Sequence, residues 1–257
     1  MAISFDITAA THTGQARALF ATLASGSDEP VVLTTLSGAD LSVLGGMSWE
    51  ALATSWNQLK PEERSKIVEA RTTQMIERGL LIEEAPGQGY DPHAYYAVGP
   101  KLGIALAARF NPTFIITSTV SPKQAPLTLF AVGDATTRVR GIVMEVPSLI
   151  PGKEKETLRW GPLSWQFNHL LVTQDFAGEY LAEWTLRNVP SNAFHKKTPR
   201  TVALYRPSEG AAPTAELAVL GNGTTARVTG QGIDGEFDMI ALRAIMLDLL
   251  GRGARPV

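Results

Sequence analysis

The sequence predicts an α+β protein with a mixed or antiparallel sheet, formed by two pseudo-symmetric strand sets with helices packed on it. Composition is the first reason, because the 257 residues are 44% hydrophobic and 19% charged, as in globular proteins with a sizeable core. The second reason is that three β-rich segments followed by a helical segment occur twice. The third is spacing: equivalent strand starts lie 87, 88 and 86 residues apart, at Phe114 and Thr201, Leu127 and Ala215, and Arg138 and Thr224.

The first part of the chain is predicted to open with a β-α-β unit and to continue with two helices. The opening comprises a strand at 3–7, a helix near 14–23, a turn at 25–28 and a strand at 30–35. Ser48 is a suitable N-cap for a helix that runs to Leu59. The next helix, from Pro61 to Arg78, has a proline and two glutamates in its first turn and Gly79 after its end.

The remaining elements form the two strand sets. They are preceded by a strand at 80–84, a turn at 86–89 and a helix at 92–109 that Gly99-Pro100 interrupts or delays. The first set comprises strands at 114–121, 127–132 and 138–146 and a long helix at 164–187. After a loop at 190–199, the second set comprises strands at 200–205, 215–220 and 224–229 and a helix at 236–250.

Two local features of the second set are predicted in more detail. Asn222-Gly223 between two alternating apolar segments indicates a type I′ hairpin turn, since both residues tolerate a positive φ. Residues 221–226 formally match a dinucleotide-binding fingerprint as well. That fingerprint has to lie at the start of a helix, whereas a strand is predicted here, so we interpret the match as part of the hairpin turn. The last helix is apolar over most of its circumference and is predicted to supply core residues Leu242, Ile245, Met246 and Leu249.

The sequence contains no pattern that predicts catalysis, a metal site or a cofactor. There are no cysteines, and the four histidines (His12, His93, His169 and His195) are too far apart for a local metal-binding pair. Each histidine is therefore interpreted as a surface or hydrogen-bonded residue. A nucleophile elbow and a phosphate-binding loop are absent from the sequence as well. We expect a protein that is not an enzyme and that holds no cofactor.

Charge and hydropathy bear on location and partners. The net charge of −2 and the pI of about 6.1 give no reason to expect specific binding of nucleic acid. The N-terminus has no basic and apolar leader pattern, and Met239 to Leu250 is shorter than the ~20 residues of a membrane span. We therefore expect a cytoplasmic protein without membrane insertion, whose oligomeric state, monomer or dimer, is open.

The predicted long helix at 164–187 offers the candidate partner-binding residues. Projected at 100° per residue, one stripe contains Trp165, Val172, Phe176, Tyr180 and Trp184, and an opposite face contains Phe167, Leu170, Leu171 and Leu181. In one interpretation both faces are buried, between a sheet and another helix. In the other, the aromatic stripe is left available as an anchor for a partner, and its binding residues are Trp165, Phe176, Tyr180 and Trp184.

A winged-helix regulator with a C-terminal sensing domain is an alternative interpretation. The helices at 48–59 and 61–78, followed by the strand and turn after Gly79, imitate a winged helix-turn-helix. The reading helix would begin Pro61-Glu62-Glu63, however, and two acids at that position would repel phosphates. An α+β domain that binds a small molecule or acts as an enzyme, with a site assembled from distant residues, is a further alternative.

The order of elements resembles the EspG family, cytosolic chaperones of the type VII (ESX) secretion systems of actinobacteria. The resemblance is carried by Pro30-Val31-Val32-Leu33 after an opening strand and helix, and by Pro61-Glu62-Glu63-Arg64 before a helix that ends Glu77-Arg78-Gly79-Leu80-Leu81. It continues with Tyr90-Asp91-Pro92, Asn111-Pro112-Thr113-Phe114, and Ile233-Asp234-Gly235-Glu236-Phe237 before the last helix. The loop His195-Lys196-Lys197 has no counterpart in the family pattern.

This resemblance covers most of the chain and implies one EspG-like domain, 1–257, with pseudo-repeat halves at 111–190 and 198–252. It implies a chaperone or adaptor that binds helical type VII secretion substrates, PE–PPE-like or WXG100-like, and keeps them soluble before export. The implied partner is a helical secreted effector heterodimer whose apolar tip is shielded. The resemblance implies no catalysis.

Overall fold

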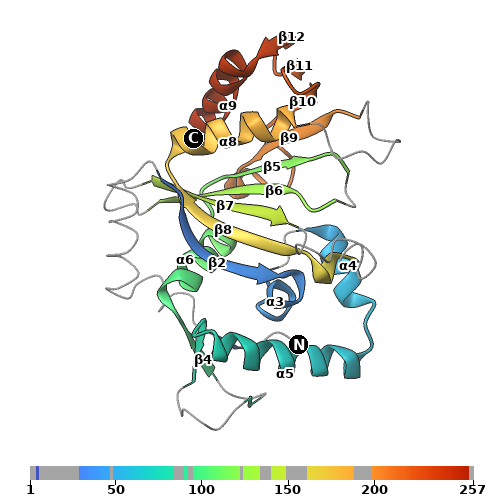
Figure 1. The fold of residues 1–257 in the computed structure, drawn as a ribbon, viewed down its shortest axis with the longest axis vertical. Helices are drawn as coiled ribbons and strands as arrows, with labels where there is room; N and C mark the ends of the chain where they lie inside the picture. The colour runs from blue at the N-terminus through green and yellow to red at the C-terminus, as the bar shows by residue number, and fades with distance from the viewer. Residues whose placement is uncertain are drawn as a thin grey trace. The chain divides into compact units, whose positions relative to one another are not determined.

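The computed structural model describes residues 4–5, 29–46, 49–83, 90–91, 95–121, 124–133, 140–148, 161–187 and 198–254. The chain forms two compact units that are interleaved in sequence. The first unit is formed mainly by residues 31–111 and 145–170, and the second mainly by residues 112–144 and 171–257. Figure 1 labels the elements of both.

The first unit combines helices with a small sheet and the edge strands of a larger one. Its elements are β1 (Ser4–Phe5), β2 (Val31–Ser37), α3 (Gly38–Val43), α4 (Glu50–Asn57), α5 (Pro61–Glu77), β3 (Leu81–Ile82), β4 (Tyr95–Val98), α6 (Pro100–Phe110), the 3₁₀ turn Gly161–Ser164 and β8 (Gln166–Val172). β4 pairs with β1 in parallel and with β3 in antiparallel orientation. β8 lies between β2 and the end of β7 (Arg140–Ser148).

Helix α5 has the bounds that its sequence predicts, because its end signals are local. Pro61 occupies the first turn, and the backbone N–H of Lys60 donates to Glu63 Oε2 at 2.8 Å. Gly79 follows the C-cap Arg78 with φ of +66°, which only glycine adopts without strain. The predicted helix at 48–59 is also confirmed, as α4, and its N-cap is Trp49; Ser48, the predicted cap, lies outside the described residues.

The second unit contains most of the antiparallel sheet. Its elements are β5 (Ile115–Thr119), β6 (Leu127–Gly133), the first part of β7, α8 (Gln174–Leu186), β9 (Arg200–Tyr205), the 3₁₀ turn Pro207–Glu209, β10 (Ala215–Gly221), β11 (Thr225–Gly230), β12 (Ile233–Asp238) and α9 (Met239–Ala254). The strand order is β12-β11-β10-β9-β5-β6-β7, and β5 and β9 pair in antiparallel orientation.

The registers of two hairpins confirm the predicted pseudo-symmetry of the strand sets. In the first hairpin Ile115 pairs with Phe130, and Thr117 with Thr128. Adding 87 to each number gives Val202 with Leu217 and Leu204 with Ala215, which are pairs of the β9–β10 hairpin. Because β5 and β9 are adjacent and antiparallel, the two hairpins extend outward from a common centre. Each set, however, has four strands and a helix rather than three strands and a helix.

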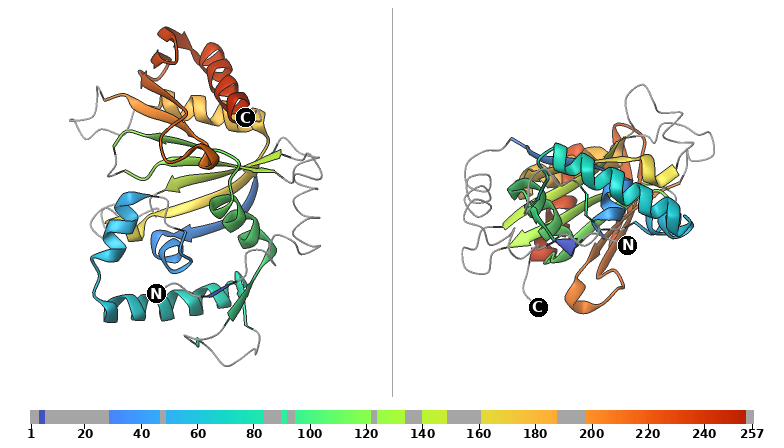
Figure 2. Two further views of the ribbon diagram at one scale, coloured as in Figure 1. Left: turned by 180° about the vertical axis from the view of Figure 1, so that it is seen from behind. Right: turned by 90° about the horizontal axis from the view of Figure 1, so that it is seen from below.

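Helices α8 and α9 pack together and on the sheet of the second unit. Figures 1 and 2 show α8 on one face of the strands, which pass in front of it when seen from behind. The covered sheet face carries the buried side chains Val202, Leu204, Leu217, Val219 and Val228. Of the four core residues predicted for the last helix, Leu242, Met246 and Leu249 are buried, whereas Ile245 is half-buried.

The predicted long helix at 164–187 is wrong in its first half. Residues Gln166–Val172 form strand β8, in which Phe167, His169 and Leu171 are buried alternately with half-buried neighbours. Thr173 then accepts a hydrogen bond from the N–H of Phe176 at 3.2 Å and begins α8. The alternating burial typical of a strand therefore ends at β8, and the N-cap Thr173 begins the helix directly after it.

Three further predictions need correction. The segment predicted as a helix at 92–109 contains strand β4 before α6; of the two effects predicted for Gly99-Pro100, the structure shows the delay, since the helix begins at Pro100. The helix predicted from 236 begins at Met239, after β12. The β10–β11 hairpin is confirmed, but Gly223 alone in its turn has a positive φ, so the turn is not type I′.

Several predicted segments lie outside the described residues: the helix near 14–23, the turns at 25–28 and 86–89, and most of the loop at 190–199. A search of the helices that the structure describes finds none long and apolar enough to span a membrane.

Candidate functional site

Three aromatic rings form a ladder along one side of α8. Phe176, Tyr180 and Trp184 recur every fourth residue, so successive rings lie one turn apart. The ring centroids of Phe176 and Tyr180 are 6.1 Å apart with an interplanar angle of 22°, and those of Tyr180 and Trp184 are 6.4 Å apart at 20°. We call these three residues the aromatic ladder. Because the three rings are nearly parallel, they form one continuous row along the helix.

Two guanidinium groups lie over the ladder. The Arg187 guanidinium is 5.9 Å from the Tyr180 ring centroid, and that of Arg200 on β9 is 5.3 Å from the Trp184 ring. Arg187 also pairs with Glu183 at 3.4 Å. Burial raises the pKa of Tyr180 and lowers the pKa of Arg200.

The exposure of the ladder lies between the two interpretations of the sequence. All three side chains are half-buried, whereas the neighbouring Ala177, Leu181 and Ala182 are fully buried against the core of the unit. The indole N–H of Trp184 is buried and has no hydrogen-bond acceptor among the described residues. A row of exposed acids, Asp175, Glu179 and Glu183, borders the rings along the helix.

Trp165 does not belong to this ladder. It precedes β8 in the first unit and makes an edge-to-face contact with Trp49, with centroids 6.3 Å apart. Trp49 in turn contacts Phe167, at 6.4 Å. The structure thus brings together three of the four residues predicted for partner binding and assigns the fourth to a separate aromatic cluster.

A cluster of three buried ionisable side chains lies within the first unit. Arg109 from the last turn of α6 forms an ion pair with Glu145 on β7, and it donates a second hydrogen bond to the carbonyl of Gly46. His169 Nε2 on β8 lies 3.0 Å from Glu145 Oε2. The exposed fractions of the Arg109, Glu145 and His169 side chains are 3%, 3% and 0%. We call this the buried charge cluster.

The surroundings of this cluster favour a neutral imidazole. Burial, with a further contribution from the Arg109 cation, lowers the pKa of His169 to about 3. Backbone hydrogen bonding with Phe167 and Thr34 opposes this shift but is outweighed. Burial also lowers the pKa of Arg109, to about 9, so that Arg109 stays charged at neutral pH. At pH 7 the cluster holds one cation, one anion and one neutral ring.

Sequence reasoning did not find this cluster, although it interpreted His169 as a surface or hydrogen-bonded residue, and the second of these is what the structure shows. The available signal was Glu145 inside the apolar segment Ile142-Val143-Met144 to Val146, since a lone acid in a buried strand needs a partner. A His–Glu pair has the composition of an acid–base pair, and in this structure both side chains are buried away from solvent.

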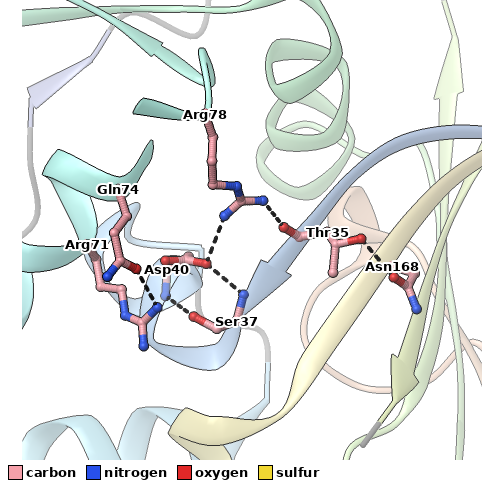
Figure 3. Close-up of polar contacts among 7 residues, drawn as sticks. All are labelled: Thr35, Ser37, Asp40, Arg71, Gln74, Arg78 and Asn168. Atoms are coloured by element: carbon pink, nitrogen blue, oxygen red, sulfur yellow. Dashed lines mark hydrogen bonds and ion pairs between the residues drawn. The ribbon is translucent and has the colours of Figure 1, made fainter. Parts of the chain in front are cut away.

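A second polar network joins α5 to β2 in the first unit (Figure 3). Ser37 and Asp40 form a reciprocal capping box, with hydrogen bonds of 2.8 and 3.0 Å between the backbone N–H of each and the side chain of the other. Arg78 lies 3.7 Å from the buried Asp40 carboxylate and donates to the carbonyl of Thr35 at 2.5 Å. The side chain of Thr35 donates to Asn168 on β8 at 2.8 Å. We interpret this network as structural, because its contacts hold the end of α5, strand β2 and strand β8 together.

The described part of the chain contains no group of three or more His, Cys, Asp or Glu side chains placed to hold a metal ion. The aromatic ladder is the candidate binding surface, and its chemistry is that of apolar and cation–π contact. Comparisons of this chain with protein-family models, with curated proteins and with solved structures gave no significant match.

Proposed function

We propose that this protein is a non-catalytic chaperone or adaptor that binds a helical type VII secretion substrate, such as a PE–PPE-like heterodimer, and keeps it soluble in the cytoplasm before export. The proposal combines the resemblance to the EspG family with one structural observation, the half-buried aromatic ladder of α8. The ladder supplies the apolar contact area that such a partner needs.

The ladder has the chemistry of an interface anchor. Tyrosine and tryptophan lose little conformational entropy when they are immobilised, and they are enriched among residues that dominate binding energy. Stacking between successive rings and the guanidinium groups of Arg187 and Arg200 restrict the rings before any partner arrives. The exposed acids beside the ladder supply the polar rim typical of such surfaces.

A titration with a helical partner tests this proposal. The probe is a purified PE–PPE-like helical heterodimer, and the variants are Trp184→Ala and Ile240→Ala. Ile240 lies on α9 of the same unit and is 81% exposed, so it controls for the loss of an exposed apolar side chain outside the ladder. Trp184→Ala should weaken binding by ~2 kcal/mol, which is about 30-fold in Kd, with little change in Tm. Ile240→Ala should bind like the unchanged protein.

Two results would contradict the proposal for this surface. Full-strength binding by a folded Trp184→Ala variant would remove the ladder from the interface. A loss of ~3 kcal/mol or more in unfolding free energy, without a separate loss of affinity, would show that the rings serve the core instead.

The winged-helix alternative has one observation in its favour. Strands β3 and β4 follow α4 and α5 in the chain and pair in antiparallel orientation, which is the position of a wing. Helix α5 nevertheless exposes Glu62, Glu63 and Glu69, which would oppose phosphates. Fluorescence anisotropy with duplex DNA at ~100 mM salt separates the two functions. Submicromolar, sequence-selective binding that is lost in Lys66→Ala would favour the regulator.

A further inference from the structure

We propose that the buried charge cluster makes the first unit acid-sensitive: the unit closes around a neutral His169, and a proton taken up at this imidazole opens the packing of α6, β7 and β8. This inference concerns the first unit and is independent of the aromatic ladder, which belongs to the second.

A single proton at His169 can affect several elements, because they meet at one point. Arg109, Glu145 and His169 come from three different elements and meet at a single carboxylate oxygen, Glu145 Oε2. Arg109 also bonds the carbonyl of Gly46, so the turn after α3 is tied to the same point. Disturbing this point therefore affects a helix, two strands and a turn together.

The charge balance of the cluster gives acid its effect. With a neutral imidazole, the Glu145 carboxylate faces one cation, Arg109. A protonated imidazole would place a second cation beside the first, and the cluster would carry a net positive charge away from water. Among the described residues, the charged groups that face His169 are Arg109 from α6 and Glu145 from β7, while β2 contributes backbone at Thr34 and β8 contributes backbone at Phe167. A buried net charge of this kind is strongly unfavourable.

The direction of the pH dependence follows from linkage. The native state holds the pKa of His169 near 3, whereas the unfolded chain has the ordinary value of 6.5. Below pH 6.5 the open or unfolded state therefore binds the proton that the closed state refuses, and the closed state loses stability as the pH falls toward 3. Between pH 8 and pH 5 the equilibrium constant for opening should rise about 30-fold. Above pH 6.5 the contribution of His169 is complete and constant.

Two measurements on the unchanged protein test the proposal. In the first, NMR follows the imidazole carbon-bound protons of His169 from pH 8 to pH 4, and the folded protein should show no protonation of this ring. In the second, hydrogen exchange followed by mass spectrometry compares pH 7 with pH 5 after correction for the intrinsic exchange rate. From pH 7 to pH 5, exchange in α6, β7 and β8 should accelerate about tenfold or more, and by a larger factor than exchange in α9.

Variants identify the responsible histidine. His169→Gln keeps a hydrogen-bonding side chain but cannot take up a proton, so its opening should vary less with pH than that of the unchanged protein. His93→Gln and His195→Gln are matched controls that should keep the full pH dependence. An imidazole of His169 that titrates near pH 6.5 in the folded protein would overturn the proposal. So would equal corrected exchange of α6, β7 and β8 at pH 7 and pH 5. Both results can be obtained even if His169→Gln does not fold.

Discussion

Alanine at position 178 tests how closely α8 and α9 pack. Gly178 lies within α8 and faces α9, where a Cβ atom at this position would lie 2.5 Å from Leu247 Cδ2 and 2.8 Å from Leu247 Cγ. It would also lie 3.6 Å from Leu250 Cδ1, which is an ordinary contact. Because Cγ is close to the main chain of Leu247, a rotation of the end of that side chain does not clear the overlap.

Two opposing terms set the stability of Gly178→Ala. Replacing glycine by alanine inside a helix gains about 1 kcal/mol, because the unfolded chain loses freedom and the helix gains a better former. Forcing an extra carbon into packed side chains costs about 1–3 kcal/mol. The short distances place this site toward the upper part of that range, so we expect Gly178→Ala to lower the free energy of unfolding by about 1 kcal/mol. Urea denaturation at constant pH measures it.

Gly251 provides the matched control. It is also helical, in α9, but a Cβ atom there meets nothing within 4 Å. Gly251→Ala should therefore raise the free energy of unfolding by about 0.5–1 kcal/mol, the opposite sign for the same chemical change. In Gly178→Ala combined with Leu247→Ala, the steric cost should largely disappear, and a double-mutant cycle isolates this term. If Gly178→Ala stabilises as much as Gly251→Ala does, the two helices do not approach as closely as the structure shows.

The elements whose ends are determined by neighbouring residues were the ones the sequence predicted well. Helix α5 is the clearest case, since Pro61, the Glu63 contact and Gly79 all act within a few residues of the helix end. The β9 and β10 strands are similar, because alternation and turn residues are local signals as well. The offset of 87 residues between the β5–β6 and β9–β10 hairpins could be predicted from sequence, because the two hairpins have the same spacing between their strands.

Strand β8 shows why the remaining elements were harder to predict. Leu170, Leu171 and Val172 are consecutive apolar residues that fit a helical stripe as well as a strand, and the aromatic residues of α8 continue the helical pattern. What decides for a strand is pairing with β2 and β7, which are distant in sequence. Strand β12 is a comparable case: Asp234-Gly235 has the composition of a turn but lies within the strand, and the turn before it is formed by Gly230, Gln231 and Gly232, all with positive φ.

The candidate sites divide along the same line. The aromatic ladder repeats every four residues within one helix, so Phe176, Tyr180 and Trp184 could be grouped from sequence even though the predicted helix began too early. The buried charge cluster joins side chains from α6, β7 and β8, and arginine, glutamate and histidine are each most common at surfaces. Only the sheet and α6 together make them neighbours.

Two further changes probe the cores of the units. Leu249→Ala, at a buried site of α9, should cost about 2–5 kcal/mol in urea denaturation, and a change below ~0.5 kcal/mol would show that this part of α9 is peripheral. Glu145→Gln removes the carboxylate that faces Arg109, and breaking a buried ion pair in this way typically costs about 3–5 kcal/mol. Replacing both partners by apolar residues, as in Arg109→Met with Glu145→Leu, should cost less than Glu145→Gln alone, because the loss arises from the remaining buried cation rather than from the missing attraction. If the double variant loses as much unfolding free energy as Glu145→Gln, or more, the cluster is not closed to water. Side chains that reach water keep their solvation when a partner is removed, so removing both partners would then bring no relief.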